Sequence, residues 1–77
     1  MVRIRRETKG RGGKAVTVIA GIPEHPDTLK TLCKQLKKRC GVGGAVKGDT
    51  IEIQGEQRAV CQEHLEKMGY QVKLSGG

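Results

Sequence analysis

Aromatic side chains are almost absent from this 77-residue chain, which contains one tyrosine, Tyr70, and neither phenylalanine nor tryptophan. Proteins that bind single-stranded nucleic acid by stacking its bases need several exposed rings. The composition therefore excludes that class of nucleic-acid-binding surface. The short length predicts a single domain over residues 1–77 with one small core and no deep catalytic cleft.

Long hydrophobic segments are missing as well. The longest apolar stretch, AVTVIAGI at residues 15–22, is too short to span a bilayer. The first residues, VRIRRE from position 2, are charged, and no apolar signal-peptide region follows them. We therefore expect a cytoplasmic protein without a membrane partner. The odd number of cysteines, three, fits reduced thiols in that compartment.

Motifs for metal binding or catalysis are also lacking. Cys33, Cys40, Cys61 and His64 could ligate zinc, but no cysteine pair has the close C-x2–4-C spacing of a usual site. Cys33 and Cys61 are instead expected to fill the core, one from each helix. Residues 43–49, GGAVKGD, lack the Gly-Lys-Ser/Thr ending of a phosphate-binding loop. Since no nucleophile–base pair or paired carboxylates occur at usable spacing, we expect no enzyme activity, no metal and no cofactor.

Positive charge is abundant, and it is concentrated in the first part of the chain. The formal net charge is +7; residues 1–47 contain 12 Lys and Arg against 3 Asp and Glu, whereas residues 48–77 contain 3 against 5. A clustered positive field attracts a polyanion such as nucleic acid. The alternative is that the lysines only keep the chain in solution.

The hydrophobic pattern alternates between the periods of strands and helices. Strands are predicted at 2–8, 15–22, 45–46, 50–54 and 70–74, and helices at 28–40 and 57–68. This order, ββαββαβ, predicts an α+β fold, a two-layer sandwich of a mixed or antiparallel sheet with two helices on one face.

The ends of these elements carry their own signals. Asp27 or His25 is a candidate N-cap of the first helix, and Gly69 follows the second helix at the position where glycine often ends a helix. Cys61, Leu65 and Met68 are spaced to form the apolar face of that helix. Residues 75–77, Ser-Gly-Gly, are expected to form a flexible tail.

The first two strands would form a hairpin whose loop, KGRGGK, contains only glycine and cations. Glycines allow a hairpin tip to approach phosphates without Cβ clashes and to turn its N–H groups outward. A flexible turn without a function is the alternative. We predict an RNA-binding loop made of Lys9, Gly10, Arg11, Gly12, Gly13 and Lys14.

The first helix separates an apolar face from a lysine stripe. On a helical wheel, its leucines and cysteines share one sector, and a second sector holds Lys30, Lys34, Lys37 and Lys38. No acidic residue between Thr28 and Cys40 relieves the repulsion among these lysines. Because the apolar face is needed to cover the sheet, it is not available for a membrane surface. The lysine stripe therefore favours contact with the phosphate backbone of a nucleic acid.

Three segments of the chain resemble the eukaryotic-type translation initiation factor 1 family, and especially its short bacterial and archaeal members. They are the basic glycine-rich hairpin, LKKRCGVGGAVKGDTIEIQGEQR at residues 36–58, and GYQVKLSGG at residues 69–77. The most specific parts are Cys40, Gly43 and Gly44 after the basic helix end, and Ile53-Gln54-Gly55 followed by an acid and Arg58. The resemblance covers nearly the whole chain.

This resemblance implies a monomeric factor that binds ribosomal RNA of the small ribosomal subunit near the P site. Such a factor favours correct pairing of initiator tRNA with the start codon of the mRNA. The family's contacts correspond here to the hairpin loop and to Lys34, Lys37 and Lys38. Arg58, next to Gln54 and Gly55, is either a surface residue at the start of the second helix or part of a second RNA contact. A general RNA-binding module or RNA chaperone acting through phosphate contacts is the alternative, and a protein adaptor is a third.

Overall fold

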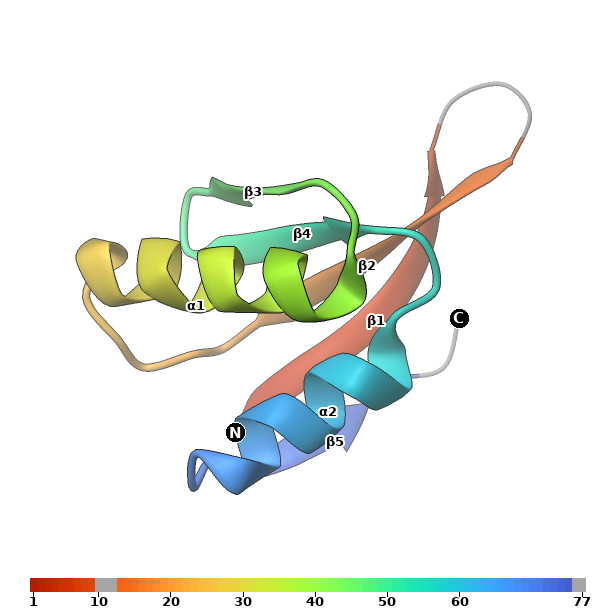
Figure 1. Cartoon of the computed structure of the whole chain (residues 1–77). Helices are drawn as coiled ribbons and strands as arrows, with labels where there is room; N and C mark the ends of the chain where they lie inside the picture. Colours follow the sequence, from red (N-terminus) through yellow and green to blue (C-terminus); the bar gives the residue numbers. More distant parts are fainter. Residues whose placement is uncertain (10–12, 76–77) are drawn as a thin grey trace.

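The computed structural model describes residues 1–9 and 13–75 of the chain. Within them, five strands and two helices follow one another in the predicted order ββαββαβ (Figure 1). The elements are β1 (Val2–Lys9), β2 (Lys14–Ala20), α1 (Pro26–Cys40), β3 (Gly44–Lys47), β4 (Thr50–Gln54), α2 (Arg58–Lys67) and β5 (Val72–Leu74). The predicted α+β fold is confirmed.

The strands form one mixed sheet in the order β3-β4-β2-β1-β5. All neighbours are antiparallel except β1 and β5, which run parallel with Val2 opposite Val72 and Ile4 opposite Leu74. The backbone N–H of Ser75 donates a hydrogen bond of 2.8 Å to the carbonyl oxygen of Ile4. Ser75, which the sequence places in a flexible tail, therefore extends the pairing with β1, while Gly76 and Gly77 lie outside the described residues.

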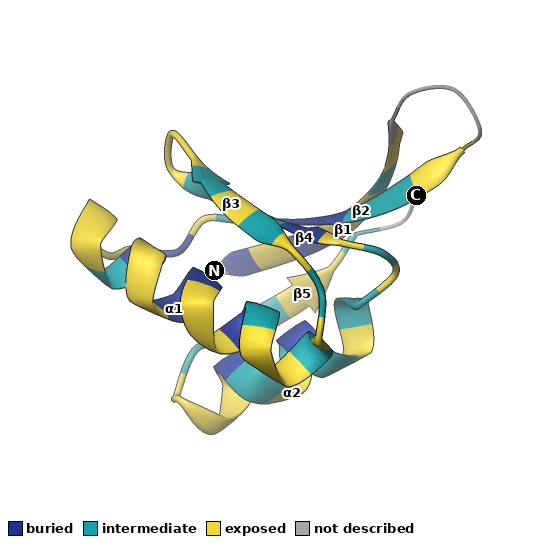
Figure 2. Cartoon of the chain, turned by 45° about the horizontal axis from the view of Figure 1, so that its top comes forward, coloured by how far each residue is buried: buried dark blue, intermediate teal, exposed yellow. Residues whose placement is uncertain are grey.

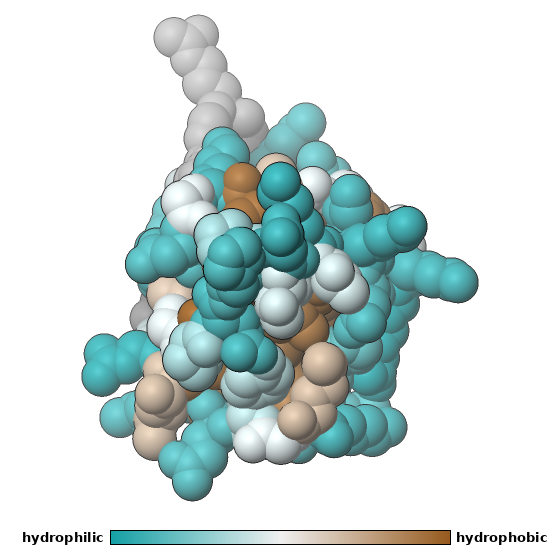
Figure 3. Space-filling model, turned by 90° about the vertical axis from the view of Figure 1, so that its left-hand side faces the viewer, coloured by the Kyte–Doolittle hydropathy of each residue, from teal (hydrophilic) through white to brown (hydrophobic). Residues whose placement is uncertain are grey.

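Both helices pack on the same face of the sheet, as predicted. α1 lies over β3 and β4, and α2 lies over β1 and β5 (Figure 1). The core between the layers contains the inward-facing isoleucines of the strands and the leucines of the helices, with buried residues on the side of α1 that faces the sheet (Figure 2). Cys33 and Cys61 are both buried there, so their predicted role as core residues is confirmed. On the side where α1 begins, the surface is largely hydrophilic, with only small hydrophobic patches (Figure 3).

Several predicted boundaries were wrong by two residues. α1 begins at Pro26 rather than Thr28, because His25 is its N-cap: the His25 Nδ1 accepts a hydrogen bond of 3.3 Å from the backbone N–H of Asp27. β2 ends at Ala20 rather than Ile22. Gly21, which follows it, has a φ of +79°, and a Cβ there would lie 2.6 Å from the carbonyl oxygen of Met1.

The end of α2 also differs from the prediction. Met68 is the C-cap and 47% exposed, so its predicted place on the apolar face was wrong. Gly69 follows with a φ of +97°, as expected for a glycine that ends a helix. The Tyr70 N–H donates to the Leu65 carbonyl at 3.1 Å, so Tyr70 belongs to the helix end and β5 starts later, at Val72. Leu74, the last residue of β5, is 42% exposed.

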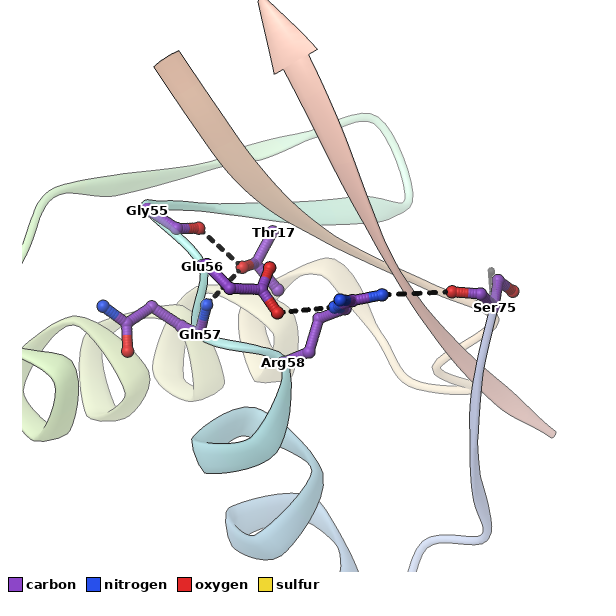
Figure 4. Close-up of polar contacts among 6 residues, drawn as sticks. All are labelled: Thr17, Gly55, Glu56, Gln57, Arg58 and Ser75. Carbon is purple, nitrogen blue, oxygen red and sulfur yellow. Dashed lines mark hydrogen bonds and ion pairs between the residues drawn. The ribbon is translucent and has the colours of Figure 1, made fainter. Parts of the chain in front are cut away.

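Thr17 is a fully buried polar side chain in the middle of the sheet. Its hydroxyl donates to the carbonyl oxygen of Gly55 and accepts from the backbone N–H of Gln57, each at 2.8 Å (Figure 4). The Gly55 N–H also donates to the carbonyl oxygen of Ala15 at 2.9 Å. These bonds attach the connection between β4 and α2 to β2, and they fix where α2 begins.

We predict that Thr17→Val lowers the free energy of unfolding by about 1–3 kcal/mol, because the Gln57 N–H and the Gly55 carbonyl lose their shared partner while the side-chain shape is kept. Urea unfolding would measure this. Thr31→Val is the matched control: the Thr31 hydroxyl donates to the Asp27 carbonyl on the exposed side of α1, and its loss should change stability by less than about 0.5 kcal/mol. Equal, small effects of the two changes would contradict the importance of the buried hydroxyl.

Candidate nucleic-acid interface

The paired ends of β1 and β2 extend away from the body of the molecule. The strands remain paired in register up to Lys9 opposite Lys14, and they project beyond both helices (Figure 1). Gly13 has a φ of +67°, a left-handed conformation that favours glycine, and Lys14 is exposed. Of the six predicted loop residues, the structure places Lys9, Gly13 and Lys14; Gly10, Arg11 and Gly12 lie outside the described residues.

The lysine stripe of α1 lies beside β3. Lys30, Lys34 and Lys37 line a shallow groove of about 260 Å³ together with Cys33 and with Gly44, Ala45 and Val46 of β3. Lys30, Lys34 and Lys38 are exposed and Lys37 is half-buried. The structure therefore brings three of the four predicted helix lysines together in one groove, and Lys38 is exposed outside its lining.

Gly44 makes this close packing of α1 against the sheet possible. A Cβ at this position would lie 2.6 Å from the Glu52 carbonyl oxygen, 2.8 Å from Ile53 Cδ1 and 3.2 Å from Lys37 Cγ. The first two distances are too short for any side chain, so only glycine fits without a backbone shift. As a result, the stem of Lys37 packs against β3.

Glu63 of α2, an acidic side chain near α1, is already paired with other cations. Glu63 accepts hydrogen bonds from Arg39 and forms an ion pair of 3.3 Å with Lys67, and these two partners lower the pKa of its carboxyl group. Within residues 1–9 and 13–75, the ion pairs include neither Lys14 nor any lysine of the stripe. Their positive charge is therefore not neutralised by the described part of the chain.

A polar contact with α2 holds the other side of α1. Arg39 donates to the His64 Nδ1 at 3.3 Å, and because arginine can only donate, the proton of a neutral His64 lies on Nε2, 3.1 Å from the Gln35 Oε1. Burial, followed by the charges of Arg39 and Lys67, lowers the pKa of His64. This contact fixes the rotation of α1, so the lysine stripe faces β3 and solvent.

The three residues of the possible second contact divide into two groups. The Arg58 Nε donates to the Glu56 carboxylate at 2.6 Å, and its Nη1 lies 3.4 Å from the Ser75 carbonyl oxygen (Figure 4). Arg58 thus connects the start of α2 to the end of β5. Gln54 and Gly55 instead line a separate hollow of about 570 Å³ with Lys14, Ala15, Val16 and Val42.

Sequence reasoning missed three residues of this region. Val42 lines the hollow, and Gly43 lies against Gln54: a Cβ at position 43 would be 3.2 Å from the Gln54 Cδ. In the sequence, Gly43 was singled out only as part of the family resemblance, with no contact assigned to it, and Val42 was not singled out. Thr17 was also missed, although a hydroxyl residue inside an otherwise apolar run was a visible signal of a buried hydrogen bond.

The candidate metal ligands do not form a site in the described residues. No group of three or more His, Cys, Asp or Glu side chains is placed there to hold a metal ion. Burial raises the pKa of Cys33, and burial with the neighbouring Cys40 thiol raises the pKa of Cys61 to about 12. The helices of the described residues include none that is both long enough and apolar enough to cross a membrane.

Comparison with known proteins gives a family match and close relatives. The family model described as translation initiation factor SUI1 matches residues 1–71. An uncharacterized protein of Haemophilus influenzae is 53% identical over all 77 residues, which span 73% of that protein, and YciH of Escherichia coli is 49% identical over 77 residues, 71% of its length. A protein translation factor SUI1 homolog of Methanocaldococcus jannaschii is 48% identical over 63 residues, 82% of this chain and 61% of that protein.

We predict that the three thiols react with iodoacetamide at clearly different rates in the folded protein. Half-buried Cys40 should be labelled first at pH 8, because Cys33 and Cys61 are buried and their raised pKa values keep them as thiols. Mass spectrometry of digested samples would give the rates, and all three should become similar in denaturant. Labelling of Cys61 as fast as Cys40 in the native state would contradict this packing.

Proposed function

The chain belongs to the SUI1 family of translation initiation factors, and from this membership we propose that it binds the small ribosomal subunit near the P site and promotes correct start-codon selection. The match over residues 1–71 supports a role in translation initiation. The family is one of translation factors and not a known family of enzymes. Ribosomal RNA is the proposed binding partner, with initiator tRNA and mRNA as its neighbours at the P site.

The lysine groove between α1 and β3 is the observation that carries this proposal. Lys30, Lys34 and Lys37 line it, and their charges have no ion-pair partner among the described residues. Lysine ammonium groups bind phosphates and read shape and charge without reading sequence. An RNA backbone supplies the regular array of anions that such a groove fits.

The basic hairpin supplies a second point of contact. Lys9 and Lys14 close its paired strands, and the loop between them, with Gly10, Arg11 and Gly12, continues the same positive charge. A rigid hairpin that projects from the body reaches a groove or ridge of folded RNA that the helix does not. Base stacking is not part of this mode, because the Tyr70 hydroxyl donates to Glu24 at the opposite end of β1.

The test of the proposal is cosedimentation with isolated small ribosomal subunits. We expect the protein, acting as a cytoplasmic monomer, to bind these subunits far more tightly than bulk RNA of equal phosphate content. Equal affinity for both would favour the alternative function, a general RNA-binding module or RNA chaperone, since phosphate contacts alone carry no preference for the ribosome.

Changing Lys34, Lys37 and Lys38 to Gln together should weaken small-subunit binding. The dependence of log K on log salt should become flatter by roughly 0.7–0.9 for each phosphate that the variant no longer binds. Stability should stay within about 0.5 kcal/mol, because like-charge repulsion decreases and glutamine keeps the Cγ that packs against Gly44. A salt titration of binding and a urea unfolding curve measure the two effects.

The matched control for this triple change is Lys47, Lys67 and Lys73 to Gln, which removes the same charge from β3, α2 and β5. It should affect binding less and leave most of the salt slope in place. If both triple variants show the same fall in affinity, net charge alone attracts the RNA and the lysine groove has no special part.

A second prediction concerns the hairpin: Arg11→Ala combined with Lys14→Ala should weaken small-subunit binding without lowering the melting temperature. Lys14 is exposed and makes no ion pair with a described residue, so its loss should change stability by less than about 0.5 kcal/mol. Cosedimentation and thermal unfolding measure the two properties.

Arg3→Ala with Lys73→Ala, an equal charge change on paired residues of β1 and β5, serves as the control. A large fall in melting temperature would mean that the loop is structural.

A further inference from the structure

A hollow lies where the hairpin leaves the body of the molecule. Its lining comes from three places: Lys14, Ala15 and Val16 at the start of β2, Val42 in the connection from α1 to β3, and Gln54 and Gly55 at the end of β4. Its volume of about 570 Å³ is within the range of sites that hold small organic molecules. Gly44, which lines the lysine groove, comes only two residues after Val42, which lines the hollow. The linings of the two concave regions are therefore close together in the chain.

The walls of the hollow offer apolar contacts to a flat group. The apolar residues of its lining are Ala15, Val16 and Val42, and Gly55 has no side chain to obstruct entry. The polar backbone here is already engaged, because the Gly55 N–H donates to the Ala15 carbonyl oxygen and the Gln54 N–H donates to the Gly43 carbonyl oxygen, both at 2.9 Å. A ligand in the hollow would therefore meet apolar residues and backbone N–H groups that already have hydrogen-bond partners.

Gln54 adds a hydrogen-bonding group that is free to bind a ligand. The side chain is exposed, and its carboxamide lies against Gly43, with the Cδ and Nε2 both 3.2 Å from the position of a Cβ on that residue. Among the described residues, this carboxamide neither donates nor accepts a hydrogen bond. It thus presents an acceptor beside a donor, the pair that glutamine uses to bind the edge of adenine.

Lys14 completes the site with a charge. It is exposed at the rim and forms no ion pair within the described chain. An apolar wall, a free carboxamide and a neighbouring cation match the three parts of a nucleotide: the base ring, the base edge and the phosphate. A protein side chain of a partner would fill the apolar part but would leave the carboxamide and the cation unused.

We infer that this hollow binds one unstacked nucleobase, adenine by preference, from the RNA that the hairpin and the lysine groove hold. This inference rests on the proposed function, and it adds a contact that reads base identity to an interface otherwise made of phosphate contacts. Gln54 binds the base edge, Val16 and Val42 contact the ring, and Lys14 binds the adjacent phosphate.

The test uses an RNA hairpin with one bulged adenosine and the same hairpin with an abasic residue at the bulge. Fluorescence anisotropy should show the adenosine RNA binding about 5-fold or more tightly, the lower end of the effect of one bidentate base contact. Gln54→Met should reduce this preference, because the base edge loses its partner while Val16 and Val42 still contact the ring, and it should leave the affinity for the abasic RNA unchanged. Gly43→Ala should reduce the preference as well, because the added methyl group displaces the carboxamide.

The control is Gln71→Met, an identical change at an exposed position just before β5, which should keep the full preference. Equal affinity for the two RNAs, or a preference that Gln54→Met leaves unchanged, overturns the inference. If small-subunit binding is intact in that case, the proposed function stands without the base contact. If the wild-type protein binds neither small subunits nor either RNA, the proposed function is refuted and the inference with it.

Discussion

The buried hydroxyl of Thr17 is the contact on which the arrangement of this molecule depends. It joins the Gly55 carbonyl and the Gln57 N–H to the central strand β2, so the direction of the chain as it leaves β4 is set from inside the core. α2 starts one residue later, at Arg58, and its Cys61 and Leu65 reach the core from there. The bond to the Gly55 carbonyl also holds Gly55, which lines the hollow, against β2. A single side chain thus determines both the seating of the second helix and the geometry of the candidate base-binding hollow.

The charged side chains of the described surface fall into two groups: those that form ion pairs within the fold and those that do not. Glu56 pairs with Arg58 at the start of α2, and Glu63 of α2 pairs with Arg39 in the last turn of α1. Glu52 pairs with Lys47 across the β3–β4 hairpin. The lysines on the other flank of α1 receive no such neutralisation from the described residues. This segregation keeps the unpaired lysines separate from the charges that orient the helices, so a change in one set should leave the other largely unaffected.

The sequence predicted the fold and the basic surfaces well, because both depend on patterns that are local in the chain. The alternation of Ile51 and Ile53 gave β4 without error, and the spacing of Leu29, Leu32 and Leu36 gave the buried face of α1. Met68 was misplaced because helix periodicity does not show where the helix stops. The hollow was not foreseen, since Lys14, Val42 and Gln54 meet only through the pairing of β2 with β4 and the close approach permitted by Gly44. The sequence did not decide the role of Arg58, because its partner Ser75 is 17 residues away in the chain.

The parallel pairing of β1 with β5 has a consequence for how the protein is made. Residues 2–4 are synthesised long before residues 72–74, with which they pair on the second edge of β1. The β1–β2 hairpin has only local contacts to form and can fold early, whereas one edge of β1 stays without its strand until synthesis of this region is nearly complete. During that interval Val2 and Ile4, which are fully covered in the finished fold, lack part of their packing. The last part of the core therefore closes only after residues 72–74 have been synthesised, well after the β1–β2 hairpin is able to form.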